Sequence, residues 1–60
     1  MNATIEVEMN NAAFGDAPTL ELARILRKLA DDIEQSRELR DLPLLRDING
    51  NTVGWIDVRT

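Results

Sequence analysis

Few residues of this chain could carry out chemistry. Neither cysteine nor histidine occurs among the 60 residues, which excludes disulfides, thiol nucleophiles, imidazole bases and the usual zinc ligand sets. Ser36 has no histidine to activate it. The carboxylates Asp31, Asp32 and Glu34 are expected on an exposed helix surface, where nothing would shift their pKa toward catalytic work. We therefore predict that the protein is not an enzyme and uses no cofactor.

One spacing resembles that of a metal-binding loop. Asp47, Asn49 and Asn51 match the first three ligand positions of an EF-hand. The sixth position, however, would be Thr52 rather than glycine, and the twelfth would be Val58 rather than glutamate. No helices are expected on either side of this segment. We therefore predict a turn here and no metal site.

A second candidate is a group of basic residues, Arg24, Arg27 and Lys28, which could form a docking patch for an acidic partner. The other interpretation is a solvated helix face supported by ion pairs. Arg27 lies four residues before Asp31, which allows a pair on a helix, although in the less favoured orientation. Lys28 stands in the same relation to Asp32. The net charge of -4 at pH 7 argues against a general affinity for phosphate backbones.

An amphipathic helix, predicted at about residues 18–36, positions these basic residues. Its apolar side chains fall on one stripe of the helical wheel, with the charged side chains opposite. The stripe consists of Leu22, Ile25, Leu26, Leu29, Ala30 and Ile33. This is the pattern of a helix that packs one side on a core. Because the stripe fails further on, the helix is expected to end near Ser36 and to be followed by a charged connector.

The start of this helix has two possible positions. Pro18 suits the first helical position, since its missing N–H would have no partner there. Ala17 would then precede the helix without offering a side-chain acceptor, unless Asp16 reaches in. Alternatively, the helix begins at Thr19, with the threonine hydroxyl as its cap.

A strand is predicted before the helix, at about residues 3–9. Ile5, Val7 and Met9 alternate there with polar residues, which is typical of a strand with one buried face. Between this strand and the helix, Phe14 is too large to be left in water without a reason. We expect Phe14 to pack under the start of the helix.

A hairpin is predicted from strands at about residues 43–48 and 52–59. The dipeptide Asn49-Gly50 between them is the strongest short-range hairpin signal. Its register stays open. Asn49 and Gly50 could be the central residues of a type I′ turn, or residues 47–50 could form a type I turn with Gly50 in the left-handed region. The two differ by one residue of pairing, which changes the cross-strand partners.

A strand, a helix and a hairpin make a small two-layer α+β domain. The shortest closure of acceptable handedness gives a β-α-β-β domain over residues 1–60, with a three-stranded antiparallel sheet of order 1-3-2 and the helix on one face. Order 1-2-3, with the first two strands parallel, is the alternative. A domain of this size buries only about 60% of its unfolded surface, so a monomer would have limited stability. We therefore expect that a homodimer could form and bury more surface.

The last strand carries apolar residues on both faces. By strand alternation, Ile56 and Val58 point one way. Val53 and Trp55 point the other way. One helix covers one face only, and we expect it to cover Ile56 and Val58. The candidate interface is then Val53, Trp55 and Leu45, because tryptophan is enriched at binding hot spots. Burial of Trp55 in the monomer, self-association and a foreign partner are the three possible outcomes.

The segments NAAF, LARILRKLADDIE and LRDINGNTVG follow one another in this chain. With this combination, which extends from Ile5 to Val58, the chain resembles a group of short open reading frames of bacteriophages and prophages. LRDINGNTVG is the most specific segment. The resemblance implies a phage-related protein in the cytoplasm of a bacterial host, and it implies no activity and no functional residues. Small acidic phage proteins often bind and inhibit a host protein, which favours that hypothesis.

Composition adds the last expectations about function. The chain has no long apolar run and no basic-then-apolar start, so we expect a cytoplasmic protein without a membrane span. The leading hypothesis is a non-enzymatic protein-interaction module that modulates a host or phage protein. The alternative is a nucleic-acid-binding regulator, although nucleic acid is a disfavoured partner, with phosphate contacts from Arg24, Arg27, Lys28, Arg37 and Arg40. A DNA mimic is a weaker third hypothesis, because arginines interrupt the acidic residues.

Overall fold

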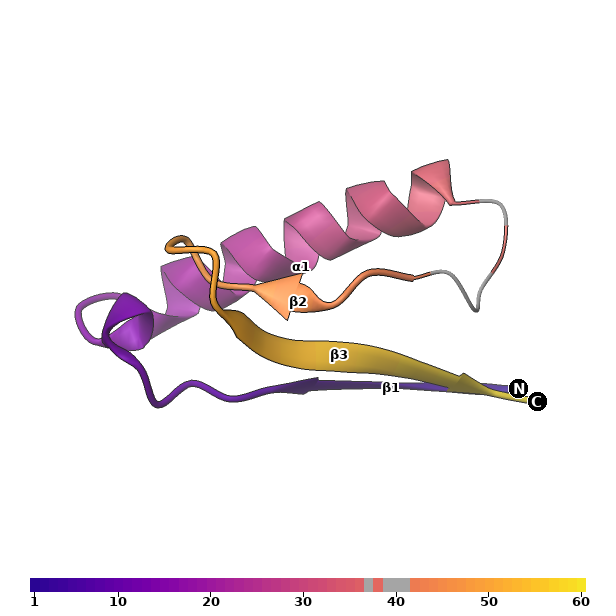
Figure 1. The fold of residues 1–60 in the computed structure, drawn as a ribbon, viewed down its shortest axis with the longest axis horizontal. Helices are drawn as coiled ribbons and strands as arrows, with labels where there is room; N and C mark the ends of the chain where they lie inside the picture. Colours follow the sequence, from indigo (N-terminus) through magenta and orange to yellow (C-terminus); the bar gives the residue numbers. More distant parts are fainter. Residues whose placement is uncertain (37, 39–41) are drawn as a thin grey trace.

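The computed structural model describes residues 1–36, 38 and 42–60, which form one long helix packed on one face of a three-stranded antiparallel sheet (Figure 1). The elements are β1 (Asn2–Val7), the short 3-10 helix η1 (Ala12–Phe14), α1 (Pro18–Gln35), β2 (Leu45–Arg46) and β3 (Thr52–Arg59). The sheet order is β1-β3-β2. The predicted α+β fold class and the predicted sheet order 1-3-2 are therefore confirmed.

The helix and the last strand have nearly the predicted bounds, whereas the other two strands are shorter. β1 ends at Val7 and not at Met9. The chain then enters η1, where the Asn11 side chain accepts a hydrogen bond of 3.0 Å from the backbone N–H of Ala13. β2 has only 2 residues and not the six expected at 43–48. The connector predicted after the helix lies largely outside the described residues.

Both ends of α1 follow from local chemistry. The helix begins at Pro18, with Ala17 as an N-cap that offers no side-chain hydrogen bond, so the earlier of the two predicted starts is observed. Ser36 is extended and ends the helix. Its N–H donates to the carbonyl oxygens of Asp32 and Ile33 at 3.0 and 3.1 Å, which satisfies two carbonyls of the last turn.

The core lies between α1, η1 and the hairpin. Its buried apolar side chains are Phe14, Ile25, Leu29, Leu45 and Val53. Val7, Ala13, Ile33 and Ile56 pack against this cluster and remain partly exposed. Phe14 is thus packed at the start of the helix, as predicted. Most of the predicted helix stripe also faces the core, but Leu26 and Ala30 at its margin are exposed.

The hairpin turn resolves the two registers that the sequence leaves open. Gly50 has φ +84°, and no other described residue has a positive φ, so Asn49 cannot be part of a type I′ turn. The Gly50 N–H donates to the Asp47 carbonyl at 3.0 Å, and the Asp47 N–H donates to the Asn51 carbonyl at 2.9 Å. This is the type I turn followed by a left-handed glycine, the second of the two predicted forms.

A β-bulge interrupts the hairpin beyond this turn. Leu45 pairs with Gly54, but the next residue of β2, Arg46, pairs with Thr52. Val53 is therefore an extra residue on β3 with no partner on β2. Such a bulge breaks the strict alternation of side chains along the strand. Consequently the faces of β3 cannot be assigned by counting every second residue from Trp55.

The bulge overturns one prediction about the sheet faces. Val53 and Leu45 were expected to lie with Trp55 on the uncovered face, but both are buried in the core beneath α1. Val53 lies in the same cluster against which Ile56 packs, and regular alternation would have placed these two on opposite faces. Only Trp55 of the three predicted interface residues remains on the surface, with 44% of its area exposed.

Candidate functional site

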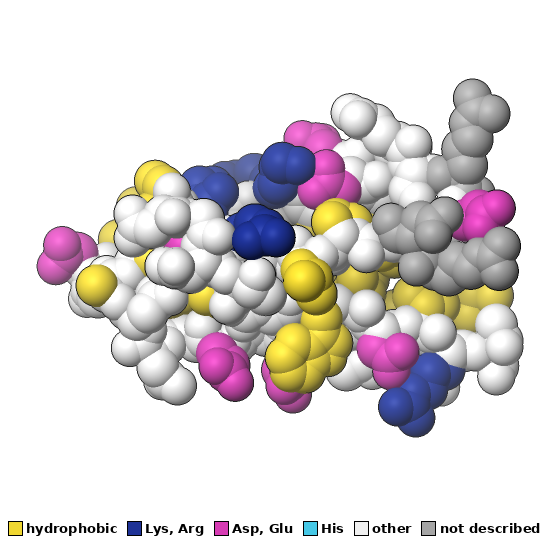
Figure 2. All heavy atoms as spheres, in the orientation of Figure 1, with side chains coloured by type: hydrophobic (Ala, Val, Ile, Leu, Met, Phe, Trp, Pro, Cys, Tyr) yellow, Lys and Arg dark blue, Asp and Glu magenta, His cyan; other side chains and the backbone are white. Residues whose placement is uncertain are grey.

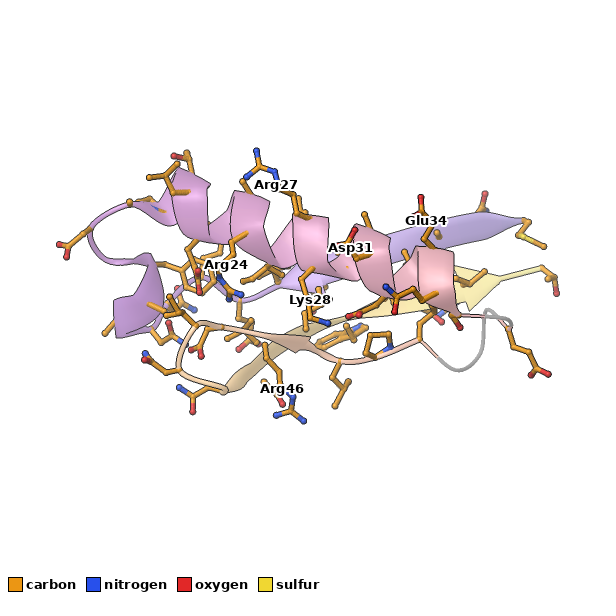
Figure 3. All side chains as sticks on the ribbon, turned by 90° about the horizontal axis from the view of Figure 1, so that it is seen from above. Arg24, Arg27, Lys28, Asp31, Glu34 and Arg46 are labelled. Carbon is orange, nitrogen blue, oxygen red and sulfur yellow. The ribbon has the colours of Figure 1, made fainter. Side chains whose placement is uncertain are left out.

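The predicted basic patch is divided between structural contacts and solvent. Arg24 donates from Nε and Nη2 to the two carboxylate oxygens of Glu21, at 2.7 and 3.1 Å. The same Nη2 also donates to the carbonyl oxygen of Arg46 at 3.1 Å. Figure 3 shows Arg24 and Lys28 on the side of α1 that faces β2, whereas Arg27 points away from it. Arg24 therefore ties the helix to β2 and is not a free docking residue.

One of the two predicted helix pairs is present. Lys28 Nζ lies 2.6 Å from Asp32 Oδ1, in the i to i+4 geometry expected from the sequence. The second prediction, Arg27 with Asp31, is wrong, because Arg27 has no ion-pair partner among the described residues. The candidate docking patch Arg24, Arg27 and Lys28 thus leaves Arg27 as its one cation free of a salt bridge within the described chain.

Glu21 is the residue on which this arrangement depends. Its side chain is buried and accepts a hydrogen bond of 2.8 Å from the backbone N–H of Ile48 in the hairpin turn. The hydrogen bond from Arg24 lowers the pKa of Glu21, and the N–H of Ile48 adds to this effect, so together they outweigh burial, which acts in the opposite direction. The Glu21 carboxylate likewise raises the pKa of Arg24. A charged, hydrogen-bonded pair therefore joins α1 to the turn.

Asp47 holds the turn from the inside. Its Oδ1 accepts from the backbone N–H groups of Asn49 and Asn51, both at 2.9 Å. Its Oδ2 accepts from the side-chain amides of Asn11 at 2.7 Å and Asn51 at 3.2 Å. Burial by itself raises the pKa of Asp47, but these hydrogen bonds exceed it and lower the pKa below its usual range. The residues of the EF-hand-like spacing thus serve a turn, because N–H donors already occupy both carboxylate oxygens.

A groove of about 340 Å³ runs between α1 and the chain around β2. Arg24, Lys28 and Asp32 line its helix side, and Pro43, Leu44 and Ile48 contribute to the other side. The polar groups on the helix wall are those already engaged in the ion pairs above. The groove therefore offers little unsatisfied chemistry to a small ligand.

The largest exposed aromatic surface lies on the sheet face away from α1. β2 begins at Leu45, which pairs with Gly54, and extending this antiparallel register by one residue would place Leu44 opposite Trp55. Leu44 is 54% exposed, and Trp55 is 44% exposed. Figure 2 shows a cluster of hydrophobic side chains protruding over the hairpin strands. We call Leu44 and Trp55, with Glu6 paired to Trp55 on β1, the Trp55 surface.

The sequence indicated part of this site. It indicated Trp55, but it named Leu45 where the exposed leucine is Leu44. Which of the two leucines is exposed depends on the bulge, and the bulge has no clear signature in the sequence. Glu21 was missed, although its i to i+3 spacing from Arg24 on a predicted helix was a usable signal.

Other kinds of site find no support in the described part of the chain. No group of three or more acidic residues is placed there to hold a metal ion. Within residues 1–36, 38 and 42–60, no helix combines the length and the apolar character that crossing a membrane requires. Arg37 and Arg40, the further phosphate contacts of the nucleic-acid hypothesis, lie outside the described residues.

Comparison with known proteins gives no relative from which a function could be transferred. No family model, no curated protein and no solved structure matches this chain. The function must therefore be argued from the surfaces of this molecule.

Proposed function

We propose that this protein is a non-enzymatic protein-interaction module, related to phage proteins and acting in the cytoplasm of a bacterial host. The observation that carries the proposal is the exposure of Trp55 beside Leu44 on the sheet face that α1 leaves open. Tryptophan is enriched at binding hot spots, because it buries a large area on contact. The partner is a host or phage protein that the module modulates.

The chemistry of the Trp55 surface indicates what the partner must offer. Glu6 lies directly across the ladder from Trp55. Asp57 lies two residues further along β3, where Arg59 pairs with it at 2.8 Å. Because Arg59 already pairs with Asp57, Glu6 is the acidic neighbour of the apolar centre, and such a surface fits a partner that presents an apolar cleft with a lysine or arginine at its rim. The overall charge of -4 favours the same kind of partner.

The nucleic-acid hypothesis receives less support. Arg24 and Lys28 each have a carboxylate partner within 2.7 Å, so binding a phosphate would require breaking an existing pair. Arg27 alone supplies too little positive charge for the several phosphate contacts that nucleic-acid affinity requires. We therefore retain protein binding as the proposed function.

Site-specific photocrosslinking in bacterial cells tests this proposal. A photoreactive phenylalanine analogue replaces Asp57, two residues from Trp55 on β3, in one variant and Asp31, on the exposed back of α1, in a matched control. Illumination is expected to attach one defined protein to position 57 and not to position 31. The adduct should disappear when an excess of the unlabelled chain competes, and it should persist when the competitor carries Trp55→Ala or Leu44→Asp. Equal labelling from both positions, or none from position 57, would refute the proposed site.

A further inference from the structure

In the sheet formed by residues 1–36, 38 and 42–60, β1 is an edge strand, with β3 on one side and no strand on the other. The N–H of Glu8 donates to the carbonyl of Val53 at 2.7 Å, so the even-numbered residues of this segment direct their backbone groups toward β3. By alternation, the N–H and C=O groups of Ala3, Ile5 and Val7 point toward the open edge. This edge carries neither proline nor bulge, the usual devices that prevent a second chain from pairing.

The side chains along this edge are apolar on the face that carries α1. Ile5 pairs with Ile56 and is 46% exposed, because α1 packs closer to β2 than to β1. Ala3 and Ile33 line one apolar cavity of about 320 Å³ at the end of the two layers. The helix flank nearest to β1 therefore stands next to an uncovered apolar row of the sheet.

The two flanks of α1 differ in chemistry. The flank toward β2 carries Arg24, Lys28 and Asp32, which are engaged in ion pairs. The other flank carries Leu26, which is 39% exposed, and the exposed Ala30. In Figure 3 β2 lies along one side of α1, whereas β1 passes behind the helix and emerges at the other side near the N-terminus. Among the described residues, none covers this apolar flank or the apolar strand edge below it.

We infer that β1 pairs with β1 of a second copy of this chain, antiparallel and centred on Ile5. In this register Ile5 faces its counterpart, and Ala3 faces Val7 of the second copy, so the outward backbone groups of all three residues find partners. On the other face, Thr4 lies opposite Glu6 of the second copy, so no like charges meet. The occupant is a second copy because the edge is complementary to itself in this register.

The dimer would be a six-stranded antiparallel sheet with both helices on one face. A stable interface buries about 800 Å² per partner. The surface of this chain is 4703 Å², so such an interface would take about a sixth of it. The backbone edge alone is too narrow for this, so the apolar flank of α1 and Ile5 would have to supply the remainder. The Trp55 surface lies on the opposite face of the sheet and stays open, so this inference does not depend on the proposed function.

Analytical ultracentrifugation over a concentration series tests the dimer with a matched pair of variants. Ile5→Lys places two ammonium groups opposite each other at the centre of the interface and should raise the dimer Kd by about 100-fold, since two buried isoleucines are also lost. Thr4→Lys introduces the same charge on the neighbouring residue, where it meets Glu6 of the second copy, and should leave the dimer intact. Circular dichroism of both variants shows whether the fold is kept.

Amide hydrogen exchange of the unmodified chain provides a second measurement that needs no mutation. The Ile5 amide should exchange more slowly as the protein concentration rises, whereas the amide of exposed Leu20 should not change. A chain that remains monomeric up to about 1 mM would overturn the inference, because a standard interface gives far tighter binding. A dimer that is indifferent to Ile5→Lys, or that Thr4→Lys disrupts equally, would also overturn it.

Discussion

Two buried acids, Glu21 and Asp47, organise the hairpin turn at the scale of single residues. Both accept backbone N–H groups of the turn, and Glu21 reaches it from α1. No buried side-chain polar atom of the described residues lacks a hydrogen-bond partner. At this end of the molecule the two carboxylates hold the structure in place of further apolar side chains. Their hydrogen bonds compensate the free-energy cost of burying charged groups.

Asp47→Asn should destabilise the protein although it preserves the size of the side chain. Asp47 Oδ2 accepts hydrogen bonds from the side-chain NH2 groups of Asn11 and Asn51. An amide nitrogen at this position would be a donor facing these two donors, so the hydrogen bonds could not form. Urea unfolding, followed by Trp55 fluorescence, is expected to show a lower midpoint for Asp47→Asn. Asp16→Asn removes an exposed carboxylate with no hydrogen bond and should keep the midpoint of the parent. Equal midpoints for Asp47→Asn and the parent would contradict this role.

The same two acids predict how stability depends on pH. Their folded pKa values are lowered, so in the acid range the unfolded chain binds more protons than the folded chain. Their contribution to stability is complete above the ordinary carboxyl pKa of about 4 and is lost as pH falls through the lowered values. The urea midpoint should therefore fall steeply below about pH 4, and less steeply in Glu21→Gln. If the urea midpoints of the parent and of Glu21→Gln fell equally steeply below about pH 4, Glu21 would not contribute to the pH dependence of stability.

For single residues, the sequence predicted the exposure of Trp55 but not the packing environment of its neighbours. Trp55 was assigned correctly to an uncovered face, since a single helix can cover only one side of the sheet. Val53 and Leu45 were assigned to the wrong face, because the pairing of Leu45 with Gly54 and of Arg46 with Thr52 leaves an extra residue. Such a bulge depends on the three-dimensional fit of turn and sheet, and no local residue signature announces it here.

β1 and β3 approach each other closely at Gly54, which pairs with Val7. A Cβ atom at this position would lie 2.0 Å from the backbone oxygen of Glu6 and 3.0 Å from Cα of Val7. Gly54 therefore permits the close approach of the two strands beside the bulge. Because the neighbouring atoms belong to the backbone, they cannot move aside without shifting a strand.

Gly54→Ala should accordingly lower the free energy of unfolding by about 2 kcal/mol, the usual cost of overpacking. Gly15→Ala is the matched control, since a Cβ there meets one backbone oxygen at 3.3 Å and the residue has φ -66°. It should change stability by much less. Chemical denaturation of both variants measures the difference, and equal effects would argue against a close contact at Gly54.

The elements themselves were largely predictable. The apolar period, Pro18 and Asn49-Gly50 encode the helix and the hairpin locally, and the sheet order follows from chain handedness. The length of β2 was not predictable. Its chain is held by hydrogen bonds from Arg24 to Arg46 and from Ile48 to Glu21, which replace strand pairing with contacts to the helix. Contacts of this kind join residues more than twenty positions apart, beyond the reach of a local pattern.

At the scale of the whole molecule, the described residues leave two apolar surfaces exposed, one at the β1 edge and one on the sheet face away from α1. The β1 edge with the exposed Leu26 of α1 is complementary to itself, and the Trp55 surface presents a tryptophan with an acidic neighbour. In the proposed arrangement, a small chain with a limited core would gain stability by pairing through the first surface and would keep the second for a different protein. Both the size of the chain and its exposed residues are consistent with this division.

Trp55→Ala tests whether the Trp55 surface takes part in self-association. Because the side chain is half exposed and lies outside the core cluster, its loss should change the free energy of unfolding by about 1 kcal/mol or less. The dimer Kd should also stay within about threefold of the parent. Circular dichroism and sedimentation measure the two quantities. A large loss of dimer would show that the Trp55 surface is the self-association interface.

The most direct measurement is the emission wavelength and the acrylamide quenching of Trp55 in the unmodified chain, recorded across a concentration series together with the molecular mass. The division of surfaces predicts that the mass doubles while Trp55 emission stays at long wavelength and remains open to quenching. A blue shift and a loss of quenching that accompany dimer formation would contradict it, because Trp55 would then lie in the interface between the two copies.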